Sequence, residues 1–174
     1  MCGIVGYTGK NQSAPVLLNG LAKLEYRGYD SAGIAVRDGD SPVQVVKAKG
    51  RLKVLAEKTN DGQSVIGNCG IGHTRWATHG GVTDQNAHPH QQGKVTLVHN
   101  GIIENYRELI ADYDLQEILH SETDSEVVVH MMDYYYKKEK NLQKALERVI
   151  TRIEGSYALC IVSTIEPDKV FIAK

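Results

Sequence analysis

The fold class follows from Gly33-Ile34-Ala35-Val36-Arg37-Asp38-Gly39-Asp40-Ser41-Pro42-Val43-Gln44-Val45-Val46. This segment consists of two apolar runs, residues 33–36 and 42–46, on either side of an Asp-Gly pair. An Asp-Gly pair between apolar runs is a common tight-turn sequence, so the segment predicts two antiparallel strands joined by a hairpin.

The rest of the chain repeats hairpins and groups helices between them. Further strands are expected at residues 2–8, 70–73 and 95–99, and in a last hairpin, 157–163 and 170–173, with a turn at 166–168. Apolar residues at helical spacing predict helices at 13–27, 51–59, 103–113, 123–138 and 141–154. Thr123 and Glu126 have the spacing of a capping box. Grouped helices between hairpins favour an α+β fold over a doubly wound parallel sheet.

The composition is that of one globular domain. The 174 residues are 41% hydrophobic and 24% charged, enough for one core and too short for two comfortable domains. Lys+Arg number 20 against 21 Asp+Glu, so the net charge of −1 gives no reason to expect nucleic acid or an anionic membrane as a partner. The sequence has no membrane-spanning apolar run and no signal-peptide layout, so we expect a cytoplasmic protein with reduced cysteines.

Cys2 is the first candidate nucleophile. Removal of Met1 would leave a thiol and a free α-amine on one residue, and the amine, with a pKa of about 7.7–8.0, could accept the thiol proton. If Met1 stays attached, the α-nitrogen is a peptide nitrogen and cannot act as a base. Taken alone, Cys2 fits better as a small buried residue at the start of a strand.

Two polar segments could supply substrate contacts. The segment 73–81 reads His-Thr-Arg-Trp-Ala-Thr-His-Gly-Gly, and its Arg75 offers a forked donor for a carboxylate. A surface loop with an ion-paired arginine explains the segment equally well. The strand at 95–99 is expected to end at Asn100-Gly101, which would present a side-chain amide and an unobstructed N–H, the donors of an oxyanion hole. Asn-Gly is also the commonest tight-turn dipeptide, and on its own it favours a turn.

Asp124 and the histidines are the remaining candidates. Asp124 follows Ser121-Glu122-Thr123 at an expected helix start, where the helix dipole favours an acid, or where an acid could receive a substrate ammonium group. Five of the 7 histidines crowd into one stretch: His73, His79, His88, His90 and His99. Their spacing matches no metal-binding motif, and the chain has no phosphate-binding glycine motif. We therefore expect neither a metal nor a cofactor.

Five motifs occur in the order of a known family: Cys2–Gly6, Tyr26–Gly33, His73–Gly80, His99–Gly101 and Ser121–Asp124. The chain resembles the glutaminase domain of the glucosamine-6-phosphate synthases, also called glutamine–fructose-6-phosphate aminotransferases (isomerizing), which are class II glutamine amidotransferases. The first and fourth motifs are shared across that class. The second and third are similar to the sugar-specific family rather than to amidophosphoribosyltransferase.

The resemblance implies a role for each matching residue. Cys2 would attack the side-chain amide of L-glutamine to form a thioester, and its α-amine would carry the proton to the departing ammonia. The oxyanion would be held by Asn100 and Gly101. The substrate's zwitterionic head group would lie between Arg75 and Asp124. The accessory positions would be Thr78 and His79 beside Arg75, Trp76 in a closing loop, and Arg27 and Asp30 as supporting residues.

The resemblance also implies a fold and a context. The fold would be a four-layer αββα sandwich of two antiparallel sheets, of the N-terminal-nucleophile hydrolase type, over residues 1–174 and incomplete at the C-terminus. In the full-length protein, expected to be a homodimer, C-terminal sugar-isomerase domains would use the ammonia to convert fructose 6-phosphate to glucosamine 6-phosphate.

Three alternatives stay open. One is the glutaminase domain of another class II enzyme, such as amidophosphoribosyltransferase or asparagine synthetase. Another is an unprocessed, inactive glutamine-binding fragment. The last is an N-terminal-nucleophile amidase for other amides, which the Arg75 and Asp124 pair disfavours.

Overall fold

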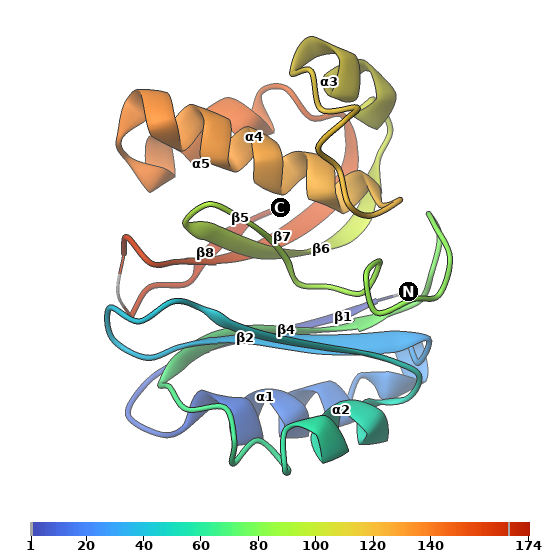
Figure 1. Ribbon diagram of the computed structural model, residues 1–174, viewed down its shortest axis with the longest axis vertical. Coiled ribbons are helices and arrows are strands. Elements are labelled where there is room, and N and C mark those ends of the chain that lie inside the picture. Colours follow the sequence, from blue (N-terminus) through green and yellow to red (C-terminus); the bar gives the residue numbers. More distant parts are fainter. Residues whose placement is uncertain (1, 167) are drawn as a thin grey trace.

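Two four-stranded antiparallel sheets lie face to face at the centre of the computed structural model, and helices cover the outer face of each (Figure 1). The structure describes residues 2–166 and 168–174. Met1, on which N-terminal processing depends, and Pro167 of the predicted C-terminal turn lie outside this part of the chain. Within it, no helix is long and apolar enough to cross a membrane.

The first sheet contains the hairpin that the sequence predicts. Its strands run in the order β1 (Gly3–Thr8), β4 (Cys69–Arg75), β2 (Ser31–Arg37) and β3 (Gln44–Lys49). β2 and β3 pair in antiparallel register with Val36 opposite Gln44, and Gly39 in the turn has a φ of +50°. β1 also runs antiparallel to β4, with Gly3 opposite Thr74. This register brings the start of β1 beside the end of β4, where the candidate site lies.

The second sheet differs from the prediction in two places. Its order is β5 (His90–Gln92), β6 (Val95–Ile103), β7 (Gly155–Ser163) and β8 (Phe171–Ala173). The sequence predicts no strand at the position of β5, because three residues carry no readable periodicity. The predicted end of a strand at Asn100-Gly101 is wrong: β6 continues to Ile103, since β7 supplies pairing partners along its whole length.

The helices form the outer layers. α1 (Ser13–Ala22) and α2 (Leu52–Lys58) cover the first sheet, and α4 (Asp124–Glu139) and α5 (Leu142–Ile150) cover the second, with α3 (Tyr106–Asp112) beside α4. Three helices are clearly shorter than predicted, and one of them is α5, which ends at Ile150 and not at residue 154. α1 ends at Ala22, and Glu25–Arg27 forms a separate 3₁₀ turn, while α3 begins only at Tyr106 because β6 occupies the preceding residues.

The predicted capping box at α4 does not form. Thr123 is the N-cap residue of α4, but its side chain accepts no capping hydrogen bond. The Glu126 carboxylate instead accepts hydrogen bonds from the backbone nitrogens of His120 and Ser121. At α5, by contrast, Asn141 caps the helix and accepts from the Lys144 nitrogen at 2.9 Å.

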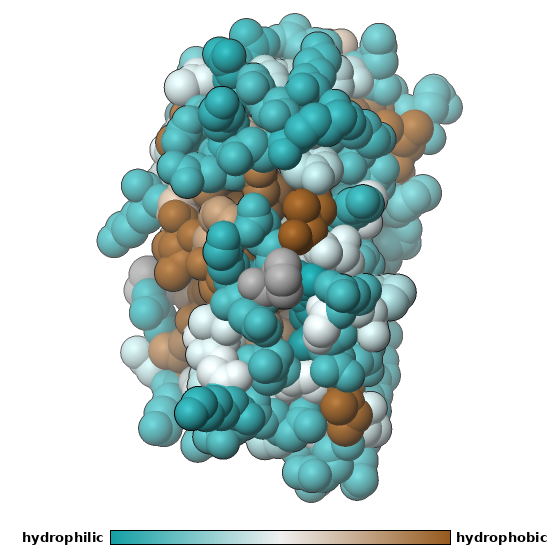
Figure 2. Space-filling model, turned by 90° about the vertical axis from the view of Figure 1, so that its left-hand side faces the viewer, coloured by the Kyte–Doolittle hydropathy of each residue, from teal (hydrophilic) through white to brown (hydrophobic). Residues whose placement is uncertain are grey.

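Apolar side chains fill all three spaces between the layers. Leu17, Leu21 and Leu55 are fully buried against the first sheet, and Val127, Met131 and Val149 against the second. Ile71, Val98 and Cys160 lie between the sheets. On the face in Figure 2, apolar residues reach the surface at the height of the sheets, between polar helix layers. The predicted α+β sandwich of two antiparallel sheets is confirmed.

Candidate active site

Cys2 lies where three distant parts of the chain meet. Its Sγ is 3.3 Å from the backbone nitrogen of Trp76 and 3.6 Å from the Trp76 carbonyl oxygen. The Asn100 side-chain amide donates to the Cys2 carbonyl oxygen at 3.3 Å. The antiparallel pairing of β1 with β4 places Cys2 next to the segment that follows β4. The structure therefore brings the candidate nucleophile together with the candidate lid and with one candidate oxyanion donor.

The surroundings of Cys2 keep its thiol protonated. Burial raises the pKa of the thiol, and the hydrogen bond from the Trp76 backbone and the charge of Arg75 only partly oppose that rise. A cysteine is nucleophilic as the thiolate. A thiol in this environment therefore needs a neighbouring base to act near neutral pH.

Gly101 occupies a position that only glycine fits. Its φ is +134°, and a Cβ atom there would lie 2.0 Å from the carbonyl oxygen of Ser156 on the neighbouring strand β7. A backbone oxygen cannot yield as a flexible side chain can, so a larger residue would push the two strands apart. The Asn100-Gly101 pair is thus part of a paired strand and not a tight turn.

A narrow cavity joins most of the predicted site residues. Its volume is about 20 Å³, and it is lined by Cys2, Arg75, Trp76, Thr78, His79, His88, His99, Gly101, Thr123, Asp124 and Ser125. A wider cavity of about 510 Å³ adjoins it and is lined by Cys2, Trp76, Thr78, Asn100, Gly101, Ile102, Ser156, Tyr157, Ala158 and Lys174. The narrow cavity has room for about one water molecule. A larger ligand can enter it only if one of its walls moves, and Trp76, Thr78 and His79 of segment 76–81 form part of those walls.

Arg75 is hydrogen-bonded to the backbone of segment 76–81. Its side chain is buried, and its guanidinium donates to the Gly81 carbonyl oxygen at 3.0 Å and to the carbonyl oxygen of His79. Burial lowers the pKa of Arg75, and several acidic groups around it oppose this effect, Asp124 among them. Arg75 is thus a fixed donor at one wall of the cavity.

Asp124 also lines the narrow cavity. Its Oδ2 accepts from the Ile103 nitrogen at 2.8 Å, and its Oδ1 accepts from the Ser125 hydroxyl at 3.3 Å. The Ser125 hydroxyl in turn lies 2.8 Å from His99 Nδ1. These contacts fix the buried carboxylate at the first turn of α4, so the cavity has one fixed cation and one fixed anion.

Four histidines pack beneath the cavity: His73, His88, His90 and His99. The rings of His73 and His88 stack at 4.1 Å, and His88 Nδ1 accepts from the His99 backbone nitrogen at 3.2 Å. Burial lowers the pKa of every one of them, to about 3 for His73 and His90. They are therefore neutral packing groups near pH 7. Within the described residues, no group of three or more His, Cys, Asp or Glu side chains is arranged to hold a metal.

Asp30 and Trp76 contact the residues around the cavity, whereas Arg27 does not line it. Asp30 accepts from the Ala77 nitrogen at 2.8 Å and donates its own N–H to the Arg75 carbonyl oxygen at 3.1 Å, so it supports the base of segment 76–81. Trp76 is 45% exposed and meets the Tyr29 ring edge-on at 5.6 Å. Arg27 ends the 3₁₀ turn and is not among the described residues that line the two cavities.

Known proteins share both the sequence and the shape of this chain. A family described as "Glutamine amidotransferase domain" matches residues 73–174. The chain belongs to the glutamine amidotransferase family. It is an enzyme family, and the resemblance predicted from the sequence motifs is confirmed.

Two curated relatives of this amidotransferase domain carry the same name. The chain is 53% identical to the glutamine–fructose-6-phosphate aminotransferase (isomerizing) of Clostridium tetani, over 98% of this chain and 28% of the relative. It is 47% identical to the protein of the same name from Chlorobaculum tepidum, over 100% of this chain and 29% of the relative. The chain thus spans less than a third of the length of these curated relatives. A solved glutamine phosphoribosylpyrophosphate amidotransferase from B. subtilis superposes with a TM-score of 0.81 and 25% identity, over 94% of this chain and 35% of that one.

Sequence reasoning missed several residues around the cavity of this amidotransferase domain. Thr123 and Ser125 line it on either side of Asp124, and His88 and His99 line it from below. His88 was considered only as a metal ligand, and His99 only as a metal ligand and as the first residue of the family motif His99–Gly101. The position of His99 directly before Asn100 was the one available signal, whereas nothing in the sequence places His88 in contact with His73 and His99.

Proposed function

We propose that this amidotransferase domain hydrolyses the side-chain amide of L-glutamine to L-glutamate and ammonia, with Cys2 as the nucleophile. One observation carries the proposal: a thiol, a fixed cation and a fixed anion line the same cavity, contributed by Cys2, Arg75 and Asp124. The α-carboxylate and α-ammonium groups of a free amino acid complement the two charges. With that head group bound, the side-chain amide extends toward the thiol.

The chemistry uses groups of this chain throughout. After Met1 is removed, the free α-amine of Cys2 accepts the thiol proton, and the sulfur attacks the amide carbon of glutamine. The oxyanion accepts hydrogen bonds from the Asn100 side chain and the Gly101 backbone N–H. The carbon–nitrogen bond of the amide then breaks, and the protonated α-amine of Cys2 gives its proton to the departing ammonia. Water finally hydrolyses the thioester to release glutamate.

The segment 76–81 acts as the lid in this scheme. The narrow cavity beneath it has room for about one water molecule, so the segment opens for binding in this scheme and closes again around the substrate. Closure excludes bulk water, which strengthens the Arg75 and Asp124 contacts and retains the ammonia. The partly exposed Trp76 lies on this lid above the thiol.

The relatives support a specific acceptor for the ammonia. We infer that residues 1–174 form the glutaminase part of a longer cytoplasmic, homodimeric synthase, whose sugar-isomerase domains convert fructose 6-phosphate to glucosamine 6-phosphate. The 53% identity to a glutamine–fructose-6-phosphate aminotransferase, against 25% to the phosphoribosylpyrophosphate enzyme, favours the sugar acceptor.

A glutaminase assay with two cysteine variants tests the proposal. The domain with Cys2 as its first residue is expected to release equal amounts of glutamate and ammonia from L-glutamine. Cys2→Ser should abolish the release, whereas Cys69→Ala, a change at a buried cysteine remote from the cavity, should retain it. Unchanged hydrolysis by Cys2→Ser would contradict the proposed nucleophile.

A further inference from the structure

Glu122 lies outside the cavity, yet it contacts the lid at the point that Arg75 braces. Its Oε2 accepts one hydrogen bond from the Gly81 backbone nitrogen and another from Asn86 Nδ2, each at 2.9 Å. The carbonyl oxygen of Gly81 accepts from Arg75 Nη1 at 3.0 Å. A continuous set of hydrogen bonds therefore runs from Glu122 through Gly81 to Arg75.

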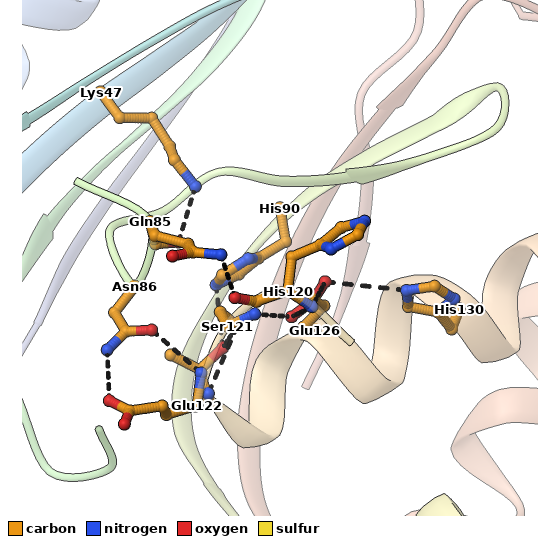
Figure 3. A network of polar contacts seen from close by, with 10 residues as sticks. Lys47, Gln85, Asn86, His90, His120, Ser121, Glu122, Glu126 and His130 are labelled. Carbon is orange, nitrogen blue, oxygen red and sulfur yellow. Dashed lines mark hydrogen bonds and ion pairs between the residues drawn. The ribbon is translucent and has the colours of Figure 1, made fainter. Parts of the chain in front are cut away.

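Asn86 fixes the geometry of this contact. Its Oδ1 accepts from the Glu122 backbone nitrogen at 2.9 Å, while its Nδ2 donates to Glu122 Oε2 and to the Gly81 carbonyl oxygen at 3.0 Å. The Asn86 side chain is almost fully buried. Figure 3 shows the amide of Asn86 facing both the backbone and the carboxylate of Glu122. The Glu122 side chain is exposed, but two hydrogen bonds hold its carboxylate and a third holds its backbone nitrogen.

The lid is shaped to rest on Glu122. Gly80 has a φ of +75°, and a Cβ atom there would lie 2.8 Å from the Glu122 Cβ and 2.9 Å from Asn86 Nδ2. Glycine is the residue that accepts this backbone conformation and this close approach together. Gly80 therefore allows the neighbouring Gly81 N–H to reach the carboxylate.

The loop residues before Glu122 are hydrogen-bonded to α4. The Glu126 carboxylate accepts from the backbone nitrogens of His120 and Ser121 at 3.0 and 2.6 Å and lies 3.7 Å from His130 Nε2. The Gln85 side-chain amide donates to the His120 carbonyl oxygen (Figure 3). The loop that carries Glu122 is thereby fastened to the same helix that begins with Asp124.

We propose that Glu122 is a positioning residue that fixes the orientation of the Arg75 guanidinium relative to Asp124. Through that orientation it determines how tightly the α-carboxylate of the substrate is bound. This inference rests on the proposed glutaminase function. The Glu122 carboxylate acts as an acceptor for Gly81, and Gly81 in turn orients the guanidinium. Glu122 itself is not expected to touch glutamine.

Two substitutions separate the acceptor from the charge. In Glu122→Gln the amide oxygen can take the place of Oε2 and keep both hydrogen bonds, so KM for L-glutamine should rise by no more than about threefold. In Glu122→Ala both bonds are lost, and KM should rise about tenfold or more with kcat within about threefold, since Gly81 and Asn86 lose the acceptor that they share. Glu108→Ala, an exposed carboxylate on α3, is the matched control.

A second substrate distinguishes positioning from general damage. L-Glutaminamide carries an α-carboxamide in place of the α-carboxylate, so Glu122→Ala should change its kcat/KM less than twofold. In an Arg75→Ala background, Glu122→Ala should add no further loss with L-glutamine. Equal losses with both substrates, or an unchanged KM for L-glutamine in Glu122→Ala, would overturn the inference.

Binding gives a readout that does not need turnover. The chain has 1 tryptophan, Trp76 on the lid, so its fluorescence can follow titration with L-glutamate. Glu122→Ala should weaken L-glutamate binding about tenfold, and Glu122→Gln should restore most of it. Tight binding by both wild type and Glu122→Ala would overturn the role of Glu122, even if hydrolysis were absent and the proposed function failed. No L-glutamate binding by the wild type would overturn both proposals.

Discussion

The Cys2 thiol and the Trp76 backbone nitrogen lie 3.3 Å apart, although 74 positions separate the two residues in the chain. The proposed nucleophile therefore makes a hydrogen bond to the segment that we propose as the lid. If segment 76–81 opens as proposed, the sulfur loses this donor, and closing returns it. In our account this contact links substrate capture to the state of the thiol.

Arg75→Lys should weaken glutamine binding while it preserves the positive charge. An ammonium group cannot reproduce the planar fork that contacts Gly81, His79 and the substrate carboxylate together. We expect KM for L-glutamine to rise about 10- to 100-fold, which corresponds to about 1.4–2.7 kcal/mol. Steady-state kinetics measure this, with Arg152→Lys at an exposed ion pair as the control. A KM equal to that of the wild type would contradict the clamp.

Asp124→Asn should separate substrate binding from folding. The amide oxygen of Asn can still accept from the Ile103 nitrogen, so urea unfolding should change by about 1 kcal/mol or less. The loss of negative charge should raise KM for L-glutamine by at least about tenfold, because the α-ammonium group loses its partner. Asp112→Asn, at an exposed carboxylate paired with Arg152, is the control for kinetics and stability. If Asp124→Asn bound glutamine normally, Asp124 would not be the ammonium site.

Gly101→Ala should destabilise the fold more than another glycine substitution with positive φ. Gly39 has a φ of +50° with open space around its Cβ position in the described structure, so Gly39→Ala tests the cost of the backbone conformation alone, about 1–2 kcal/mol. Gly101→Ala adds a collision with the Ser156 carbonyl oxygen. We expect at least about 2 kcal/mol of further loss in the free energy of unfolding. Equal losses in urea titrations would show that β6 and β7 can separate without cost.

The free energy of unfolding should already decrease below pH 6.5, at a higher pH than that at which ordinary carboxylates titrate. Burial lowers the pKa of His73 and His90 to about 3, against 6.5 in an unfolded chain, so the unfolded state binds more protons between these values. The stability from neutral burial is therefore complete above pH 6.5 and decreases as the pH falls toward 3. Each such histidine contributes a slope of up to about 1.4 kcal/mol per pH unit.

Urea unfolding between pH 7.5 and about pH 5 measures this slope, because ordinary carboxylates titrate at lower pH. The variant His90→Gln should reduce the slope by about one proton, since Gln can still bond the Thr123 hydroxyl without titrating. A free energy of unfolding that stays constant across this range would contradict the buried, neutral histidines.

The sequence predicts the layers of this fold better than its exact element ends. The hairpin at 33–46 combines a strong turn signal with apolar runs, and it forms as β2 and β3. The strand end at Asn100-Gly101 was wrong because local turn preference yielded to pairing with β7 over the full length of β6. Likewise, the Thr123–Glu126 spacing did not make a capping box, since Glu126 found two other backbone donors in the preceding loop.

Several residues that line the candidate site could be predicted where one motif carries its own chemistry. Arg75, Asp124 and Cys2 stand out as a forked cation, an acid at a helix start and a possible N-terminal thiol. The contact between Glu122 and Gly81 joins residues 41 positions apart through one carboxylate oxygen, and no local pattern encodes it. Supporting contacts of this kind depend on how separate segments pack, so they emerge only from the structure.

Labelling with an electrophilic glutamine analogue, such as a diazoketone that replaces the side-chain amide, tests the central claim most directly. The sample is the domain shown by mass spectrometry to begin at Cys2, and the adduct is located by peptide mass spectrometry. We predict one adduct, on Cys2, that excess L-glutamine prevents. An adduct on Cys69 or Cys160 in its place, or none on Cys2, would contradict the account.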